Sequence, residues 1–215
     1  MSRWWIALIV VVGCHRKNGD AFKMEQVAAQ GARACAAMKD GTVKCWGRKG
    51  NESVLAPTLA TGLTNVAKVC VTDDFECGMT RDGKLTCATL DGVTDVACGA
   101  KHVCAISGGK VFCFERDQAP REIAETAGAT AIAAGGGTTC ALFGGAVKCW
   151  GAGKRGQLGN GTFEDNDAPQ VVAGLRAKDL CVGGEHACAV LEDETIECFG
   201  SDDDGELGDG RTDQT

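Results

Sequence analysis

The chain has 215 residues, a formal net charge of −7 and 14 cysteines, with 44% hydrophobic and 24% charged residues. This hydrophobic fraction is sufficient for a folded core and argues against a largely disordered chain. The excess of acidic residues removes the positive field on which nucleic-acid-binding proteins depend, so we expect no nucleic-acid partner. Cysteine is too frequent for a protein of a reducing compartment, where disulfides rarely persist.

The N-terminus predicts export. Arg3 precedes an apolar run, Trp4 to Val12, which has the length of a signal-peptide core and is too short to span a membrane. The run ends in V-V-G followed by Cys14, which resembles the bacterial lipobox, where the signal is cleaved and the cysteine is lipidated. We expect a signal peptide over residues 1–13, then lipidated Cys14 and a linker over residues 14–26. His15 rather than Asp after the cysteine favours the outer membrane. The alternatives are an ordinary signal peptide cut elsewhere and an uncleaved apolar N-terminus.

Residues 27–215 contain five repeats, each marked by two cysteines that are nine or ten residues apart. Between the cysteines lies a turn signal, such as Asp40-Gly41 or Gly144-Gly145, flanked by strand-like residues. This pattern predicts an antiparallel hairpin whose opposed cysteines form a disulfide. The fifth turn, Glu192 to Glu194, lacks a glycine and is the weakest of these signals. The expected pairs are Cys35 with Cys45, Cys77 with Cys87, Cys104 with Cys113, Cys140 with Cys149, and Cys188 with Cys198.

Each repeat also predicts an inner strand that precedes the hairpin. An apolar residue stands eight positions before the first cysteine of every pair and is followed by small residues. One such strand and one hairpin bury too little surface alone, but they suit radial stacking as the blades of a propeller. The apolar residues are Val27, Val69, Val96, Ile132 and Leu180.

Three cysteines remain beyond Cys14 and the five pairs, so at least one thiol is free or bonded to another molecule. Cys70 and Cys98 lie in adjacent repeats. We therefore expect these two to form a disulfide and Cys181 to stay free, with three buried thiols as the alternative.

The fourth repeat contains three motifs that occur together, namely Val147-Lys-Cys-Trp-Gly151, Gly156-Gln-Leu-Gly-Asn-Gly-Thr162 and Ala168-Pro-Gln-Val-Val-Ala-Gly-Leu175. They resemble the regulator of chromosome condensation repeat, in the cysteine-paired form of exported bacterial proteins. The resemblance implies an all-β, propeller-like domain of about five short blades with disulfide-linked hairpins. Since the family usually closes seven blades, the domain is either a compact ring that residues 15–26 help to close or an incomplete seven-bladed ring.

Other residue patterns argue against a metal site, a cofactor or catalysis. His102 and His186 occupy the same position in separate repeats and lack the paired spacing of zinc ligands. The acidic run from Asp202 to Glu206 does not match the calcium-binding loop of an EF-hand and predicts a solvated loop. The sequence contains neither a nucleophile elbow nor a phosphate-binding glycine loop before a helix. We expect no metal, no cofactor and no catalytic residue.

The predicted function is therefore binding, by an exported and lipid-anchored module whose partner is a protein or an envelope component. Loops on rigid scaffolds concentrate recognition, so the segments 150–169 and 199–215 are the candidate contact surface. One alternative is a protein inhibitor of an extracellular enzyme, since the resemblance includes a secreted propeller that inhibits β-lactamase. The other is an enzyme whose site has no familiar motif. The candidate contact residues are Lys154, Arg155, Gln157, Phe163 and Glu164.

Overall fold

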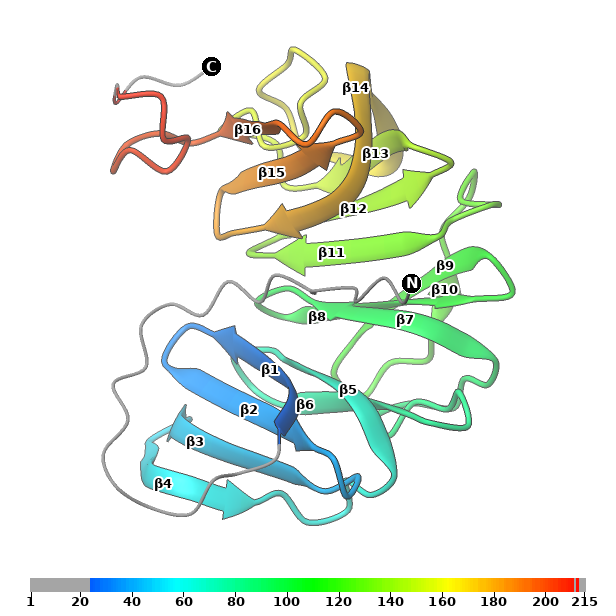
Figure 1. Ribbon diagram of the computed structural model, residues 1–215, viewed down its shortest axis with the longest axis vertical. Helices are drawn as coiled ribbons and strands as arrows, with labels where there is room; N and C mark the ends of the chain where they lie inside the picture. The colour runs from blue at the N-terminus through cyan, green and yellow to red at the C-terminus, as the bar shows by residue number, and fades with distance from the viewer. Residues whose placement is uncertain (1–23, 211, 213–215) are drawn as a thin grey trace, which may run out of the picture.

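The computed structural model describes residues 24–210 and residue 212, and every regular element within them is a β-strand (Figure 1). The strands form five blades in chain order, as the repeats predicted. Blade one contains β1 (Met24–Gln30), β2 (Arg33–Met38), β3 (Val43–Lys49) and β4 (Glu52–Leu59). Blade two contains β5 (Val66–Val71) and β6 (Glu76–Thr80). Blade three contains β7 (Val93–Cys98), β8 (His102–Ser107), β9 (Lys110–Glu115) and β10 (Arg121–Glu122).

The last two blades share one long strand, which is a difference from the separate strands that the sequence predicted. Blade four contains β11 (Ala131–Gly135), β12 (Thr138–Phe143), β13 (Ala146–Gly151) and the first part of β14 (Asn166–Val182). Blade five contains the rest of β14, β15 (His186–Leu191) and β16 (Ile196–Gly200). Residues 166–176 of β14 pair with β13, and residues 177–182 pair with β15. One continuous strand therefore belongs to both blades.

The hairpin cysteines lie directly opposite each other in four of the five blades, which confirms the disulfide-linked hairpins. Their Cα atoms are 4.0–4.1 Å apart. Since a disulfide needs both side chains on the same face of a hairpin, this register makes the bond possible. The four pairs are Cys35 with Cys45, Cys104 with Cys113, Cys140 with Cys149 and Cys188 with Cys198.

The fifth turn forms without the glycine that the other turns use. Glu194 has a φ of 74°, in the position where the first hairpin has Gly41 with a φ of 84°. Asp193 Oδ1 accepts hydrogen bonds from the backbone N and the hydroxyl of Thr195, at 3.0 and 2.6 Å. Asp40 makes the same two bonds in the first turn. These side-chain bonds hold the left-handed turn although Glu194 carries a Cβ.

The second repeat departs from the expected hairpin. After β6 the chain makes only an isolated bridge between Met79 and Leu85, and no second strand forms. Cys77 and Cys87 are still bonded, with Cα atoms 5.2 Å apart. Only ten residues separate Cys87 from Cys98 in the next blade, which leaves no length for an outer strand.

The inner strand has the same register in all five blades. The apolar residue identified in the sequence always lies opposite a small residue of the next strand, and in each blade it lies inside the inner strand. The pairs are Val27 with Ala36, Val69 with Gly78, Val96 with Ala105, Ile132 with Ala141, and Leu180 with Ala189.

We call the face of a blade toward the next blade in the chain its forward face, and the opposite face its backward face.

The core of the protein lies between the blades. Four apolar clusters fill the four interfaces between consecutive blades. In the cluster between blades three and four, Trp150 on the backward face of blade four packs with Ile106 and Val111 of blade three. Phe199 occupies the equivalent position of blade five and packs with Leu142 and Val147 of blade four. Stacking therefore buries apolar surface that a single blade leaves exposed.

Backbone contacts between the inner turns also join the blades. The backbone N of Asp73 donates to the carbonyl of Ala100, and the N of Ala100 donates to the carbonyl of Gly136, both at 2.7 Å. Gly136 has a φ of 49°, and a Cβ there would lie 1.9 Å from the carbonyl oxygen of Gly184. The small residues that the sequence places at these turns allow this close approach.

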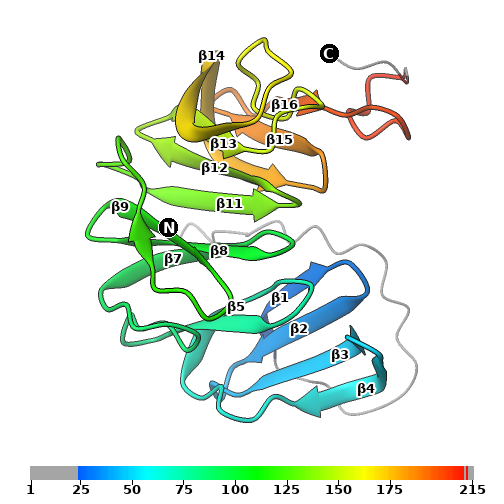
Figure 2. The same ribbon diagram turned by 180° about the vertical axis from the view of Figure 1, so that it is seen from behind.

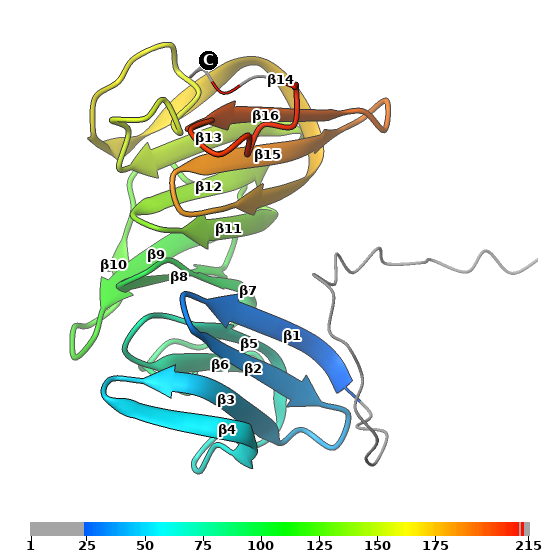
Figure 3. The ribbon, with the colours of Figure 1, turned by 90° about the vertical axis from the view of Figure 1, so that its left-hand side faces the viewer.

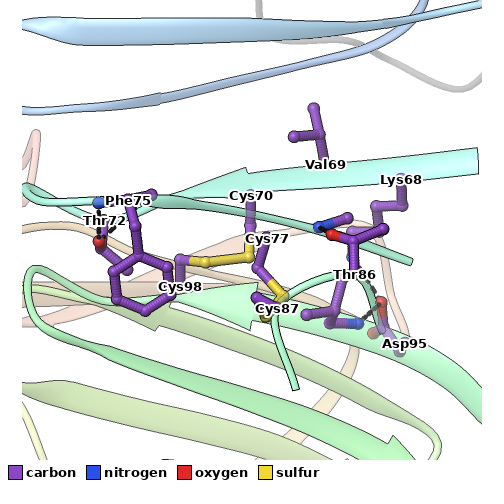
Figure 4. The surroundings of a disulfide bond; sticks show 12 residues. Lys68, Val69, Cys70, Thr72, Phe75, Cys77, Thr86, Cys87, Asp95 and Cys98 are labelled. Carbon is purple, nitrogen blue, oxygen red and sulfur yellow. Dashed lines mark hydrogen bonds and ion pairs between the residues drawn. A yellow bond between two sulfur atoms is a disulfide. The ribbon is translucent and has the colours of Figure 1, made fainter. Parts of the chain in front are cut away.

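One disulfide crosses from one blade to the next. Cys70 of β5 is bonded to Cys98 of β7, with Cα atoms 5.4 Å apart (Figure 4). This is the pair expected from the sequence, and Cys181 is free and exposed. Lys68 and Asp95 form an ion pair at 2.5 Å between the same two blades.

The five blades form an open arc. Blade one and blade five lie at opposite ends of the long axis of the molecule (Figures 1 and 3), and the view from behind shows the same order (Figure 2). β1 begins at Met24, so the last residues of the expected linker belong to the first sheet. The expected signal peptide and Cys14 lie outside the described residues. Within residues 24–210, no helix has the length and apolar character needed to cross a membrane.

Candidate functional site

A cavity of about 890 Å³ opens between blade three and blade four. Five chain segments form its wall: the β7–β8 turn, the end of β9, the segment through β10, the β11–β12 turn, and the residues flanking the β13–β14 segment. The wall combines aromatic side chains, both signs of charge and one histidine. Its charged, polar and aromatic side chains include Lys101, His102, Phe114, Glu115, Arg121, Thr139, Trp150 and Asp167.

His102 is the half-buried titratable group of this wall. Its Nε2 lies 2.7 Å from the hydroxyl oxygen of Thr139 in the next blade. Burial lowers the pKa of His102 below its usual 6.5, and the negative charge of Glu115 opposes this effect only in part. A neutral ring at pH 7 serves as a hydrogen-bonding group in the cavity. The ring lies against Gly99, where a Cβ would come within 2.2 Å of it.

His102 and His186 stay in separate blades. His186 packs against Gly183 as His102 packs against Gly99, so both histidines fill the same structural position. In the described part of the chain, no three His, Cys, Asp or Glu side chains are grouped so that they could hold a metal ion.

The segment from Gly151 to Asp167, yellow in Figure 1, starts and ends at the cavity wall. It is internally ordered. Gly153 N donates to Asp165 Oδ1 at 2.9 Å, and Arg155 N donates to Gln157 Oε1 at 2.8 Å. The side chain of Leu158 is fully buried in the cluster between blades four and five. We call residues 152–165 the β13–β14 loop.

The structure divides the five candidate contact residues into two groups. Lys154, Phe163 and Glu164 are exposed, and 52% of the surface of Phe163 is accessible. Gln157 is only 2% exposed, so the expectation that it contacts a partner is wrong. Its side chain is used for the hydrogen bond that shapes the loop. Arg155 forms ion pairs with Glu185 and Asp203 of blade five and thus fastens the loop to that blade.

The acidic loop after β16 repeats the geometry of the β13–β14 loop. Asp204 N donates to Glu206 Oε2 at 2.9 Å, as Arg155 N does to Gln157. The hydrogen bond from Asp204 N lowers the pKa of Glu206. Asp202 is fully buried and accepts a hydrogen bond from Leu207 N at 2.9 Å. The loop is therefore structured, and the expectation of a wholly solvated acidic run is wrong at Asp202.

Sequence reasoning missed the cavity and most residues that line it. His102 was considered only as a metal ligand, and Lys101, Arg121 and Thr139 carried no motif. The wall is assembled from segments that are up to about 70 residues apart, from Ala100 to Asp167. The available signal was the repeat itself, because residues in equivalent positions of adjacent blades come together at each interface.

Residues 145–190 match the family model of the Regulator of chromosome condensation (RCC1) repeat. The chain therefore contains an RCC1 repeat over these residues. The match covers the second hairpin strand of blade four, the β13–β14 loop, β14 and most of β15. It therefore includes the five candidate contact residues.

Several solved structures share the fold of this chain. Prp20p from Saccharomyces cerevisiae is similar with a TM-score of 0.74 and 16% identity, over 89% of this chain and 61% of Prp20p. Human WBSCR16 is similar with a TM-score of 0.74 and 15% identity, over 85% of this chain and 63% of that protein. The ectodomain of the Arabidopsis thaliana receptor kinase ACR4 has a TM-score of 0.55 and 20% identity, over 81% of this chain and 62% of that ectodomain. The chain thus spans about three fifths of these proteins. No curated protein matches the sequence.

Proposed function

We propose that this RCC1-repeat protein is an exported, lipid-anchored binding module that presents the β13–β14 loop and the adjoining cavity to a protein partner. One observation carries this proposal. The loop is held by its own hydrogen bonds and by Arg155, begins and ends at the cavity wall, and leaves Lys154, Phe163 and Glu164 exposed. An ordered loop loses little conformational entropy on binding.

The chemistry of the site favours a protein ligand. Phe163 is an exposed aromatic residue, and aromatic residues contribute much of the binding energy in protein interfaces. The cavity offers Lys101 and Arg121 together with Glu115 and Asp167, so its polar groups suit a ligand of mixed charge. A partner loop with an apolar residue and flanking polar groups fits this wall.

The relatives support the choice of a protein partner. The structure of Prp20p was described with its binding properties to Gsp1p and histones, and yeast RCC1 was also solved bound to Kap60. We propose that this chain uses the same kind of scaffold for a different protein of the cell envelope.

Export and lipidation rest on the sequence and the cysteine chemistry. The V-V-G sequence before Cys14 supports lipidation, and twelve cysteines in disulfides support an oxidising compartment. The intact mass of the protein from an envelope fraction, alkylated before reduction, tests both points. We expect a lipid on Cys14 and one reactive thiol, Cys181. A full set of reactive thiols without lipid would contradict the location.

The binding site is tested by comparing variants in affinity capture from envelope extract, followed by measurement of the affinity for the captured protein. We expect Phe163→Ala to weaken binding at least about tenfold, as for an interface hot spot. Leu55→Ala, at an exposed apolar residue of β4, is the matched control and keeps full binding. Equal capture by both variants would overturn the proposed site. Inhibition of a captured enzyme would define the module as an inhibitor, and turnover of envelope polymers would replace binding with catalysis.

A further inference from the structure

The forward face of blade five is uncovered. In each blade, the residue two positions before the second hairpin cysteine lies on the forward face. In blades one to four this residue is at most 8% exposed, because the next blade covers it: Val43, Leu85, Val111 and Val147. In blade five it is Ile196, which is 69% exposed. Among the described residues no further blade packs on this face.

Among residues 24–210, no blade packs on the backward face of blade one either. Val69, Val96 and Ile132 are at most 5% exposed, because each packs against the forward face of the preceding blade. Val27 has the equivalent position in blade one and is 46% exposed. Met24 on the same strand is 47% exposed. The molecule therefore offers two apolar surfaces that match the two halves of its own interblade interface.

The two ends of the arc have opposite charges. Residues 24–59 of blade one contain five Lys and Arg and three Asp and Glu, a net charge of +2. Residues 178–210 of blade five contain one Lys and eleven Asp and Glu, a net charge of −10. Complementary charges favour an encounter between these two ends of different molecules.

The uncovered forward face of blade five also carries a side chain at the position that accepts a hydrogen bond from the next blade elsewhere in the chain. The side chain of Gln26 accepts a hydrogen bond from the backbone N of Val69 in the next blade, at 2.9 Å. Asp95 does the same for the backbone N of Ile132, at 3.0 Å. Asp179 holds this position in blade five. Its Oδ1 accepts from the backbone N of the following residue at 2.9 Å, as Asp95 Oδ1 does.

The free cysteine lies at a position that forms a disulfide between blades elsewhere in the chain. Cys181 follows the recurring apolar residue of its inner strand, as Cys70 does in blade two, and Cys70 is bonded to Cys98 of the next blade. The position equivalent to Cys98 in blade one is Ala29, which is exposed.

We propose that the forward face of blade five binds the backward face of blade one of a second copy of this chain. The contact repeats the interblade interface: Ile196 packs against Val27 of the second copy, and Asp179 accepts a hydrogen bond from the backbone N of that Val27. The free Cys181 then lies opposite Ala29. Because the two faces differ, the association is head-to-tail and produces rings or linear chains of molecules.

The first experiment measures the mass of the full chain in detergent by analytical ultracentrifugation. We expect oligomers whose dissociation constant rises with salt, since opposite charges attract the two ends. Val27→Glu and Ile196→Glu each place a charge in an apolar interface, and each should weaken self-association at least about tenfold. Mixed together, these two variants should form a dimer, because each retains the face that the other lacks. Leu55→Glu, on an exposed residue outside both faces, should associate like the natural protein.

The second experiment uses the free thiol. Ala29→Cys should form a disulfide with Cys181 of another molecule under mild oxidation, which peptide mapping identifies. Ala29→Cys combined with Cys181→Ser should form none. A monomer at all concentrations, or a symmetric dimer linked through Cys181 on both chains, would overturn the proposal. A mixture of Val27→Glu and Ile196→Glu that stays monomeric while the natural protein associates would overturn the head-to-tail arrangement.

Discussion

Cys70 and Cys98 connect blade two to blade three through a disulfide that closes a segment of 28 residues. The hairpin disulfides close nine or ten residues each. Chain entropy lost from the unfolded state grows with the length of the closed segment, so the interblade bond should stabilise the fold more than a hairpin bond.

Replacing both Cys70 and Cys98 with Ala should therefore lower the free energy of unfolding by about 3.5 kcal/mol. The matched control replaces Cys188 and Cys198, where the expected loss is about 2.7 kcal/mol. Urea unfolding without reductant measures both values. A larger loss for the hairpin pair would show that loop length does not determine the effect.

Acidification should destabilise the protein through His102. Burial lowers the pKa of His102, so below about pH 6.5 the unfolded chain binds a proton that the folded chain does not. The free energy of unfolding should fall as the pH drops from 7.5 to 5.5. His102→Gln should remove part of this dependence, and His186→Gln serves as the positional control. If the free energy of unfolding depends on pH identically in the natural protein and in His102→Gln, then His102 is not the cause of the pH dependence.

Gly136 should tolerate no side chain. A Cβ at Gly136 would lie 1.9 Å from the carbonyl oxygen of Gly184, so Gly136→Ala must separate the inner turns of blades four and five. We expect a loss above about 3 kcal/mol. Gly144→Ala is the matched control, with a φ of 58° and no atom within 4 Å of its Cβ. It should cost only the left-handed strain of about 1 to 2 kcal/mol. Thermal melts compare the two variants.

The fifth turn should gain stability from a glycine. Glu194 has a φ of 74°, a conformation that strains a residue with a Cβ. Glu194→Gly should be more stable than Glu194→Ala by about 1 kcal/mol. Both variants lose the ion pair with Lys178, so their difference isolates the backbone strain. Equal melting temperatures of Glu194→Gly and Glu194→Ala would mean that the hydrogen bonds of Asp193 already offset the backbone strain.

The sequence by itself determined the repeating unit. Cysteine spacing and turn residues are local signals, and a hairpin brings its own two strands together, so four hairpins have the predicted register. The pairing of Cys70 with Cys98 followed from their places in adjacent repeats. The second repeat has an intact cysteine pattern, but in place of the second hairpin strand it forms only an isolated bridge between Met79 and Leu85, which the cysteine pattern does not reveal.

Only the tertiary structure decided which side chains face a partner. Gln157 and Lys154 lie in one loop, and their burial differs because Gln157 turns back to bond the Arg155 backbone. Val147 and Ile196 hold the same position in two repeats, and only Val147 is covered by a following blade. The cavity around His102 likewise forms only where residues of blade three and blade four meet. Burial depends on neighbours distant in the chain, which the pattern inside one repeat does not contain.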